Sequence, residues 1–265
     1  MIDTQLLKHV RKLVTEVGAY QLSRFRSLPP GGGEEKSARE FVSEVDRHSE
    51  DLLLKGLGNL LPEAGFYGEE TGISGSSKLR WVIDPLDGTS NFLSGLDQFC
   101  ISVALEVEGQ TELGVVLRPA SKECFTALRG QGLFRNDHRC PQVTDLPLQQ
   151  ALIGTGFPFR SRDLSAEFFA CAEEVLYASR GLRRFGAAAL DLSYVAAGFL
   201  QGFWESDLEP YDVAAALIFL RESGCIVTNR SGKEYSPYRD RLLVCGPPQI
   251  HASLVALVKD HYSVD

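Results

Sequence analysis

Three short acidic segments hold the residues whose types and spacing could support catalysis: residues 68–71 (GEET), 84–89 (DPLDGT) and 211–212 (YD). In the second segment, Pro85 cannot donate a ladder hydrogen bond, and it bends the chain at the end of an apolar strand pattern. Asp84 and Asp87 can therefore face one point, with the Leu86 carbonyl directed between them. Clustered carboxylates and a carbonyl are hard oxygen ligands, which suit Mg²⁺ better than Zn²⁺. The pattern favours a magnesium site.

The residues of this segment alone leave two other interpretations open. Asp-Pro and Asp-Gly are common turn dipeptides, and paired carboxylates in a turn are usually solvated. Phosphatases with an aspartate nucleophile also carry Asp-Gly-Thr, but one residue separates their two aspartates, whereas two separate Asp84 from Asp87. The backbone amides of Gly88 and Thr89 could hold a phosphate oxygen beside a bound cation.

The elements that must position these segments follow from apolar spacing and turn residues. Apolar residues that recur at three- and four-residue steps predict helices over residues 6–17, 38–60, 166–179, 187–198, 212–223 and 248–260. Short apolar or alternating runs predict strands over residues 80–83, 100–107, 113–117, 123–128, 151–155, 203–205, 225–228 and 242–245. This mixture predicts an α/β or α+β sandwich. We expect one domain over residues 1–265, made of two tightly joined halves, about 1–145 and 146–265.

Composition restricts the class of protein. Acidic residues (35) outnumber basic residues (27), and the formal net charge of −8 argues against direct binding to nucleic acid or a membrane surface. The six cysteines show neither C-x-x-C spacing nor zinc-ligand spacing, so we expect mostly buried, reduced thiols. The first residues do not resemble a signal peptide, and no apolar run approaches about 18 residues. We therefore expect a soluble cytoplasmic protein.

Several motifs together resemble the inositol monophosphatase family, within the fructose-1,6-bisphosphatase-like superfamily. They are residues 68–71, 81–92 (WVIDPLDGTSNF), 186–191 (GAAALD), 203–205 (FWE) and 211–215 (YDVAA), and their order and spacing agree from about residue 36 to 246. Residues 154–159 (GTGFPF) and 182–186 (LRRFG) are most similar to the bacterial inositol-1-monophosphatase type. The resemblance implies a layered αβαβα sandwich, a homodimer and inhibition by lithium.

The resemblance also implies two to three Mg²⁺ ions in each active site. Glu69, Asp84 and the Leu86 carbonyl would hold the first ion. Asp84, Asp87 and Asp212 would hold the second, and Glu69 would also contact a weaker third. Two metals about 3.5–4 Å apart can stabilise both the attacking water and the leaving oxygen of an in-line displacement. No covalent intermediate with the protein is needed.

The residues expected to move the proton are Thr89, Asp46 and Glu69. By resemblance, Thr89 orients the attacking water, and Asp46 or Glu69 accepts its proton. The alternative for Asp46 is a solvated carboxylate on a helix. Glu70 is more readily interpreted as a neighbour of the site than as a ligand. Lys36 could belong to a mobile loop that closes over the metals, or lie on the surface.

The predicted substrate contacts come from distant parts of the chain. By resemblance, Glu205 binds substrate hydroxyls, and the amides at residues 186–188 open a helix where they could bind an anionic or polyol oxygen. Arg183 and Arg184 are the nearest basic pair, with a surface or dimer role as the alternative. The predicted set is Leu86, Asp87, Gly88, Thr89, Arg183, Gly186, Ala187, Ala188, Glu205 and Asp212.

Two positions depart from the family pattern. Tyr211 stands where a tryptophan usually precedes the metal-binding aspartate, which should be tolerated because that aromatic mainly packs behind the metal. Ala187 stands where several relatives carry Ser or Thr, so one hydrogen bond to the substrate is missing. All the carboxylates that the resemblance assigns to the metal ions are present in this sequence.

We therefore expect a Mg²⁺-dependent phosphatase that hydrolyses inositol 1-phosphate with metal-activated water. Fructose 1,6-bisphosphate, histidinol phosphate and adenosine 3′,5′-bisphosphate are alternative substrates for the same chemistry. An alternative from another class is a regulator that binds the transcription machinery through a protein–protein contact.

Overall fold

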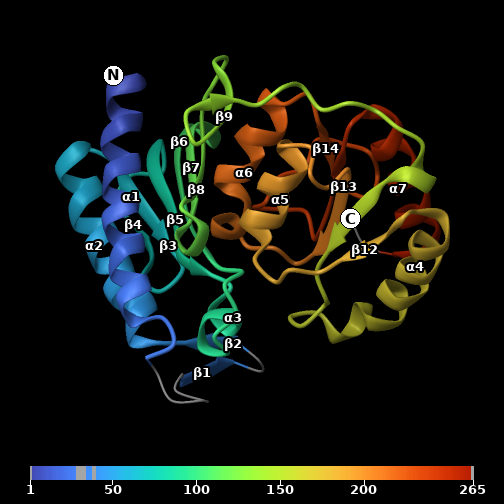
Figure 1. Cartoon of the computed structure of the whole chain (residues 1–265), viewed down its shortest axis with the longest axis horizontal. Helices are drawn as coiled ribbons and strands as arrows, with labels where there is room; N and C mark the ends of the chain where they lie inside the picture. The colour runs from blue at the N-terminus through green and yellow to red at the C-terminus, as the bar shows by residue number, and fades with distance from the viewer. Residues whose placement is uncertain (1, 28–33, 38–39, 264–265) are drawn as a thin grey trace.

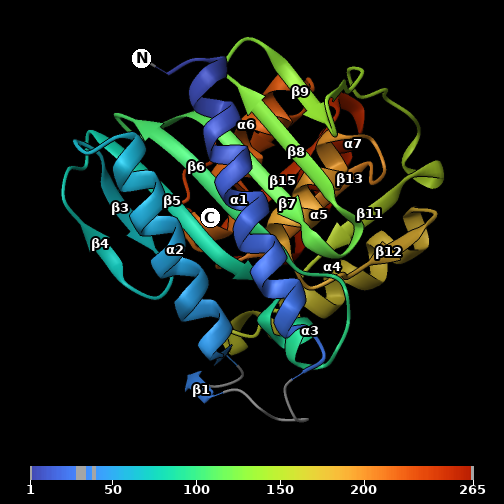
Figure 2. The same ribbon diagram turned by 60° about the vertical axis from the view of Figure 1, so that its left-hand side comes forward.

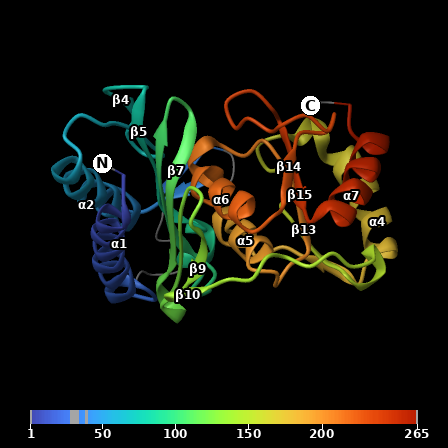
Figure 3. The same ribbon diagram turned by 90° about the horizontal axis from the view of Figure 1, so that it is seen from above.

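Five layers make up the structure, in the order helices, sheet, helices, sheet, helices (Figures 1 and 3). This computed structural model describes residues 2–27, 34–37 and 40–263. The layering confirms the αβαβα sandwich expected from the sequence. The side chain of Lys36 lies outside the described part of the chain, although its backbone belongs to a short hairpin of β1 (Glu34–Ser37) and β2 (Glu40–Val42).

The first sheet has eight strands, and all neighbouring pairs except β3 and β5 are antiparallel. In spatial order the strands are β10 (His138–Arg139), β9 (Gly132–Arg135), β8 (Glu123–Leu128), β7 (Gln110–Arg118), β6 (Cys100–Val107), β5 (Leu79–Asp87), β3 (Gly65–Gly68) and β4 (Gly72–Ser74).

Two helices cover the outer face of this sheet (Figure 2): α1 (Thr4–Arg24) and α2 (Glu44–Leu60). The prediction that the second helix starts at residue 38 was wrong. Ser43 caps α2 in a capping box with Asp46, so the helix begins at Glu44, and strand β2 precedes it. Side chains alternate along β5, so Trp81 and Ile83 pack against these outer helices, whereas Val82 faces the middle layer.

The middle layer consists of α5 (Ala188–Ala196) and α6 (Pro210–Glu222). α6 is apolar on almost every side because both sheets cover it. Gly114 on β7 permits this contact, since a Cβ there would lie 2.7 Å from the Ala215 carbonyl oxygen of α6.

The second sheet has five strands, and two helices cover its far face (Figure 3). In spatial order the strands are β12 (Gly181–Arg183), β11 (Leu152–Thr155), β13 (Gly202–Ser206), β15 (Leu242–Gly246) and β14 (Ile226–Thr228). The covering helices are α4 (Ser165–Ala178) and α7 (Pro248–His261). Alternation along β13 places Phe203 in the middle layer and Trp204 under the outer helices.

Short elements complete the chain: α3 (Thr89–Leu93) and three 3₁₀ turns, Pro119–Ser121, Leu148–Gln150 and Arg162–Leu164. All six cysteines are free and five are buried, which confirms the expectation of buried thiols. Among the described helices, none is both long enough and apolar enough to cross a bilayer.

Candidate active site

Asp84 and Asp87 lie at the end of β5, on the side of the sheet that faces α5 and α6. Asp84 pairs with Ser102 and Asp87 with Cys100, and the register shifts between them. The irregularity bends the strand so that two carboxylates separated by two residues lie near each other. Their exposed fractions are 2% and 8%. Gln21 on α1 supports the turn, because its side-chain Nε2 donates to the Pro85 carbonyl at 2.6 Å.

Glu69 approaches Asp84 from the loop that follows β3. Its backbone amide donates to the Ile83 carbonyl at 3.2 Å, which continues the pairing of β3 with β5. The fully buried Glu50 of α2 holds the same loop, because its carboxylate accepts the amides of Glu70 at 2.9 Å and Thr71 at 2.8 Å. Glu69 therefore has a fixed backbone next to Asp84.

Asp212 reaches the site from the first turn of α6. Its Oδ2 accepts the backbone amide of Glu209 at 2.8 Å, as part of a capping box. The same oxygen accepts a hydrogen bond from the guanidinium of Arg160, also at 2.8 Å. The first turn of α6 and the loop after β11 thus hold this carboxylate from two sides.

The electrostatics of these carboxylates suit a bound cation. Burial, with the charges of Glu69, Asp87 and Asp212, raises the pKa of Asp84 well above its usual range. Burial and the charge of Asp212 raise the pKa of Asp87 to about 7. No basic side chain in the described ranges forms an ion pair with Asp84 or Asp87. Hard oxygen donors whose charges repel each other fit Mg²⁺, which would neutralise that repulsion.

These carboxylates do not yet converge as a chelating group. Within residues 2–27, 34–37 and 40–263, no three acidic, histidine or cysteine side chains are arranged closely enough to hold a metal ion. The contacts of Asp212 with Glu209 and Arg160 give one physical reason, because they direct a predicted ligand toward its own loop. The donor types fit the ion.

Thr89 and Asp46 are in direct contact. The Thr89 hydroxyl lies 2.7 Å from Asp46 Oδ1 and 3.0 Å from the Leu86 carbonyl oxygen. Asp46 is fully buried and also accepts hydrogen bonds from the backbone amide and the hydroxyl of Ser43. Burial raises the pKa of Asp46 above its usual value, and these hydrogen bonds oppose the rise. Asp46 is therefore not a solvated helix carboxylate.

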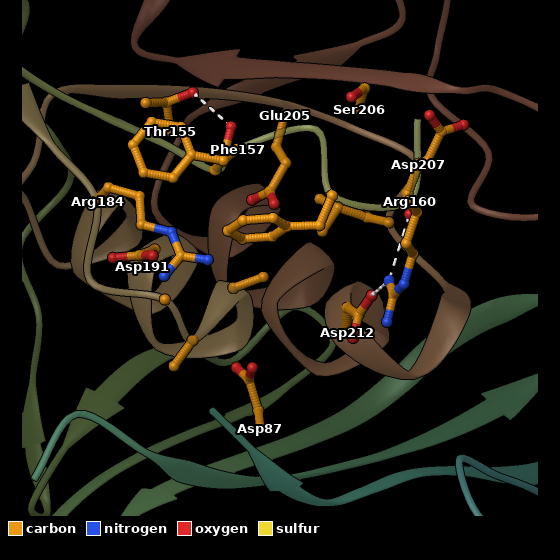
Figure 4. A pocket seen from close by; sticks show the side chains of 16 residues that line it. Asp87, Thr155, Phe157, Arg160, Arg184, Asp191, Glu205, Ser206, Asp207 and Asp212 are labelled. Carbon is orange, nitrogen blue, oxygen red and sulfur yellow. Dashed lines mark hydrogen bonds and ion pairs between the residues drawn. The ribbon is translucent and has the colours of Figure 1, made fainter. Parts of the chain in front are cut away.

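A cavity of about 150 Å³ opens between these carboxylates and the second sheet (Figure 4). Six of the predicted residues line it: Asp87, Gly186, Ala187, Ala188, Glu205 and Asp212. Figure 4 shows Asp87 on one side, Glu205 opposite, Arg184 beside Asp191, and Arg160 beside Asp212. Glu69, Asp84, Leu86, Gly88 and Thr89 are not among the residues that line the cavity.

Arg183 does not line the cavity, and its neighbour Arg184 does. Arg183 ends the edge strand β12, is exposed, and donates to the Leu182 carbonyl. The guanidinium of Arg184 lies over the rings of Phe157, at 5.4 Å, and Phe159, at 4.9 Å. Of the predicted basic pair, Arg184, which follows β12, lines the cavity, and a substrate contact by Arg183 stays a prediction.

The amides that open α5 have a partner within the protein. Asp87 Oδ2 accepts the Ala189 amide at 2.8 Å. The first turn of α5 therefore holds Asp87 in place, and a substrate contact by the Ala188 amide stays a prediction. Asn91 ties α3 to the same loop, because its Nδ2 donates to the Phe185 carbonyl at 2.8 Å.

Glu205 lies against a glycine that directly follows the neighbouring strand β11. Burial and the charge of Asp212 raise the pKa of Glu205 to about 8, whereas Arg184 and Arg160 oppose the rise. A Cβ added at Gly156 would lie only 1.8 Å from Glu205 Oε1, so the carboxylate fills the space a larger residue would need. The carboxylate reaches the cavity over the bare backbone of Gly156.

Sequence reasoning assigned no individual role to five residues that shape the site: Gln21, Glu50, Gly156, Arg160 and Asp191. Gly156 and Asp191 stand within the motifs 154–159 and 186–191, and Arg160 lies in the loop after Gly156 that we expect to supply specificity contacts. Gln21 lies eleven, seven and four residues after Val10, Val14 and Val17, so it continues the buried stripe of α1. A polar residue on an apolar stripe is the signal that could have identified it.

Known proteins are similar to this chain over most of its length. The model of the inositol monophosphatase family matches residues 3–263. The inositol-1-monophosphatase of Mesorhizobium japonicum is 40% identical over 226 residues, which cover 84% of this chain and 85% of that protein. Nus factor SuhB of Escherichia coli K12 is 36% identical over 231 residues, 86% of each chain. The crystal structure of extragenic suppressor protein suhB from Bartonella henselae superposes with a TM-score of 0.91 and 33% identity, covering 98% of this chain and 100% of that one.

Proposed function

Because the chain belongs to the inositol monophosphatase family, we propose that it is a Mg²⁺-dependent phosphomonoesterase that hydrolyses inositol 1-phosphate to inositol and phosphate. The family is one of phosphatases. The observation that carries the proposal is a cavity lined by Asp87, whose charge acts on the buried Asp84. Neither carboxylate has an ion-pair partner among the described residues, and a bound cation would balance their charge.

The proposed metal ligands are Glu69, Asp84, the Leu86 carbonyl, Asp87 and Asp212, for two to three ions. When bound, Mg²⁺ would polarise the phosphate and lower the pKa of the attacking water. Asp84 is central to this set, because the charges of Glu69, Asp87 and Asp212 all act on it.

The protein's own contribution to proton transfer is the pair of Thr89 and Asp46. Their 2.7 Å hydrogen bond directs the hydroxyl proton toward Asp46 Oδ1, which leaves the Thr89 oxygen free to accept a hydrogen bond from water. That contact orients the water for attack on phosphorus. Asp46 then accepts the proton, and Glu69 is the alternative acceptor.

The cavity supports a small substrate with both hydroxyl and anionic groups. Its lining combines carboxylates with the guanidinium groups of Arg160 and Arg184. Glu205 would accept hydrogen bonds from ring hydroxyls, and Arg184 supplies positive charge on the same wall. The backbone amides of Gly88 and Thr89 are proposed to contact the phosphate.

Phosphate release from a panel of monoesters tests this proposal. The panel contains inositol 1-phosphate, fructose 1,6-bisphosphate, histidinol phosphate and adenosine 3′,5′-bisphosphate, each with and without Mg²⁺ and with added Li⁺. We expect Mg²⁺-dependent release with the highest kcat/KM for inositol 1-phosphate, and inhibition by Li⁺. A higher value for another ester would change the substrate, and no release from any would contradict the proposed activity.

A second candidate function is binding to the transcription machinery as a protein partner. The relatives named Nus factor SuhB, which are 35–37% identical to this chain, favour it. A pull-down with the Asp87→Asn variant separates the two functions, because a partner contact should survive the loss of a metal ligand. Retention of transcription proteins by this variant would support the second function, and recovery of none by either form would contradict it.

Cytoplasmic location and a homodimer remain part of the proposal, and sedimentation tests the dimer.

A further inference from the structure

Arg160 lies where the cavity meets the carboxylate cluster (Figure 4). One guanidinium nitrogen donates to Asp212 Oδ2 at 2.8 Å and approaches the Asp207 carbonyl at 3.3 Å. The Arg160 side chain is 33% exposed, whereas that of Asp212 is 10% exposed. A positive group from the cavity wall therefore contacts a nearly buried carboxylate.

This ion pair occupies a carboxylate that the proposed function assigns to a metal. The bonded oxygen also accepts the Glu209 amide at 2.8 Å, so two donors already share it. An arginine and a cation cannot both be close to that carboxylate without mutual repulsion. A cation ligated by Asp212 would therefore compete with Arg160 for the charge of that carboxylate.

A displaced Arg160 remains at the cavity. It belongs to the loop between β11 and the 3₁₀ turn at Arg162–Leu164, and it lines the cavity together with Glu205 and Ser206. Its charge already acts on the Glu205 carboxylate across the cavity. A guanidinium matches phosphate oxygens as well as carboxylate oxygens, because its N–H groups form a planar fork.

We propose that Arg160 is a positioning residue that exchanges partners, holding Asp212 before the metal binds and the substrate phosphate afterwards. The inference rests on the proposed function and adds a coupling between metal binding and substrate binding. Metal binding at Asp212 releases a basic group to the substrate, and substrate binding removes a competitor of the metal. Each ligand thereby favours the binding of the other.

Arg160→Gln is the variant that tests the exchange, with Arg160→Lys as the conservative substitution. Arg162→Gln is the matched control, because Arg162 is exposed and does not line the cavity. Calorimetric titration of metal-free protein with MgCl₂ measures metal affinity independently of turnover. Loss of a partly exposed ion pair should strengthen Mg²⁺ binding about fivefold in Arg160→Gln.

Kinetics provide the second readout. The KM for inositol 1-phosphate should rise about tenfold in Arg160→Gln, and Arg160→Lys should recover part of both effects. Arg162→Gln should match wild type in both measurements. Unchanged or weaker Mg²⁺ binding in Arg160→Gln would overturn the exchange, and so would an unchanged KM. A wild-type protein that neither binds Mg²⁺ nor releases phosphate would instead contradict the proposed function.

Discussion

Gly156→Ala should displace the Glu205 carboxylate from the cavity without unfolding the protein. A methyl group there would lie 1.8 Å from Oε1, 2.0 Å from Cδ and 2.3 Å from Oε2 of Glu205. Non-bonded heavy atoms prefer about 3.5–4.0 Å, so the carboxylate must retreat by more than about 1 Å. The displaced group is the end of a flexible side chain, and the backbone of β11 can stay in place.

The expected loss follows from the hydrogen bond that Glu205 is proposed to accept. In assays above pH 8, where Glu205 is ionised, a hydrogen bond to this charged group contributes about 1.5–3 kcal/mol, which corresponds to a decrease in kcat/KM of about 10- to 150-fold. Steady-state kinetics with inositol 1-phosphate measure this decrease. Thermal unfolding of the same samples shows whether the fold is intact.

Two further variants make this reasoning refutable. Gly58→Ala adds the same methyl group where the nearest atom, Phe66 Cζ, is at an ordinary 3.7 Å, so its kinetics should not change. Glu205→Ala removes the clash, so the Gly156→Ala and Glu205→Ala double variant should be as active as Glu205→Ala alone. Wild-type kinetics for Gly156→Ala, or fully additive losses in the double variant, would refute the argument.

Three further outcomes are expected elsewhere in the molecule. Asp87→Asn should lower kcat by about 10³-fold or more, because it removes the charge of a proposed metal ligand. The Tm of the metal-free protein should not change, because burial and Asp212 already raise the pKa of Asp87 to about 7. A variant with normal turnover would contradict the ligand assignment. Glu106→Gln should lower the free energy of unfolding, measured in urea, by about 3 kcal/mol, because the buried Arg80 loses the carboxylate that lies 3.0 Å from it. A loss below about 1 kcal/mol would contradict this prediction. Burial lowers the pKa of His251, so the unfolded chain binds the proton more tightly and stability should fall as pH drops below about 6.5; His251→Asn should flatten this dependence in unfolding titrations.

Periodic elements could be predicted from the sequence, and so could some short strands such as the three-residue β14, whereas other short elements were not predicted. The hairpin of β6 and β7 shows a sustained apolar pattern that identified it, and β8 matched its predicted bounds. β12 has three residues, which is too short for any period, and its edge position depends on pairing with β11. Because β12 was not predicted, Arg183, which ends that strand, and Arg184, which lines the cavity, could not be told apart.

The residues of the candidate site also differ in whether a local sequence pattern identifies them. The acidic segments are contiguous motifs, so residue types and order were enough to nominate Asp84 and Asp87. Glu50 is fully buried on α2, three residues before the buried Leu53, and its helical position could have been noticed. Arg160 and Gly156 depend on contacts across about 50 residues of sequence, which no local pattern records.

The central claim is tested most directly by phosphate release from inositol 1-phosphate by protein stripped of metal with EDTA and then titrated with MgCl₂. We expect no release without metal, a saturable increase with Mg²⁺, and loss of that increase in Asp84→Asn, which removes the charge on which the three other carboxylates act. Release that is independent of Mg²⁺, or an Asp84→Asn variant that responds like wild type, would contradict the assignment of these carboxylates as the metal site of a phosphatase.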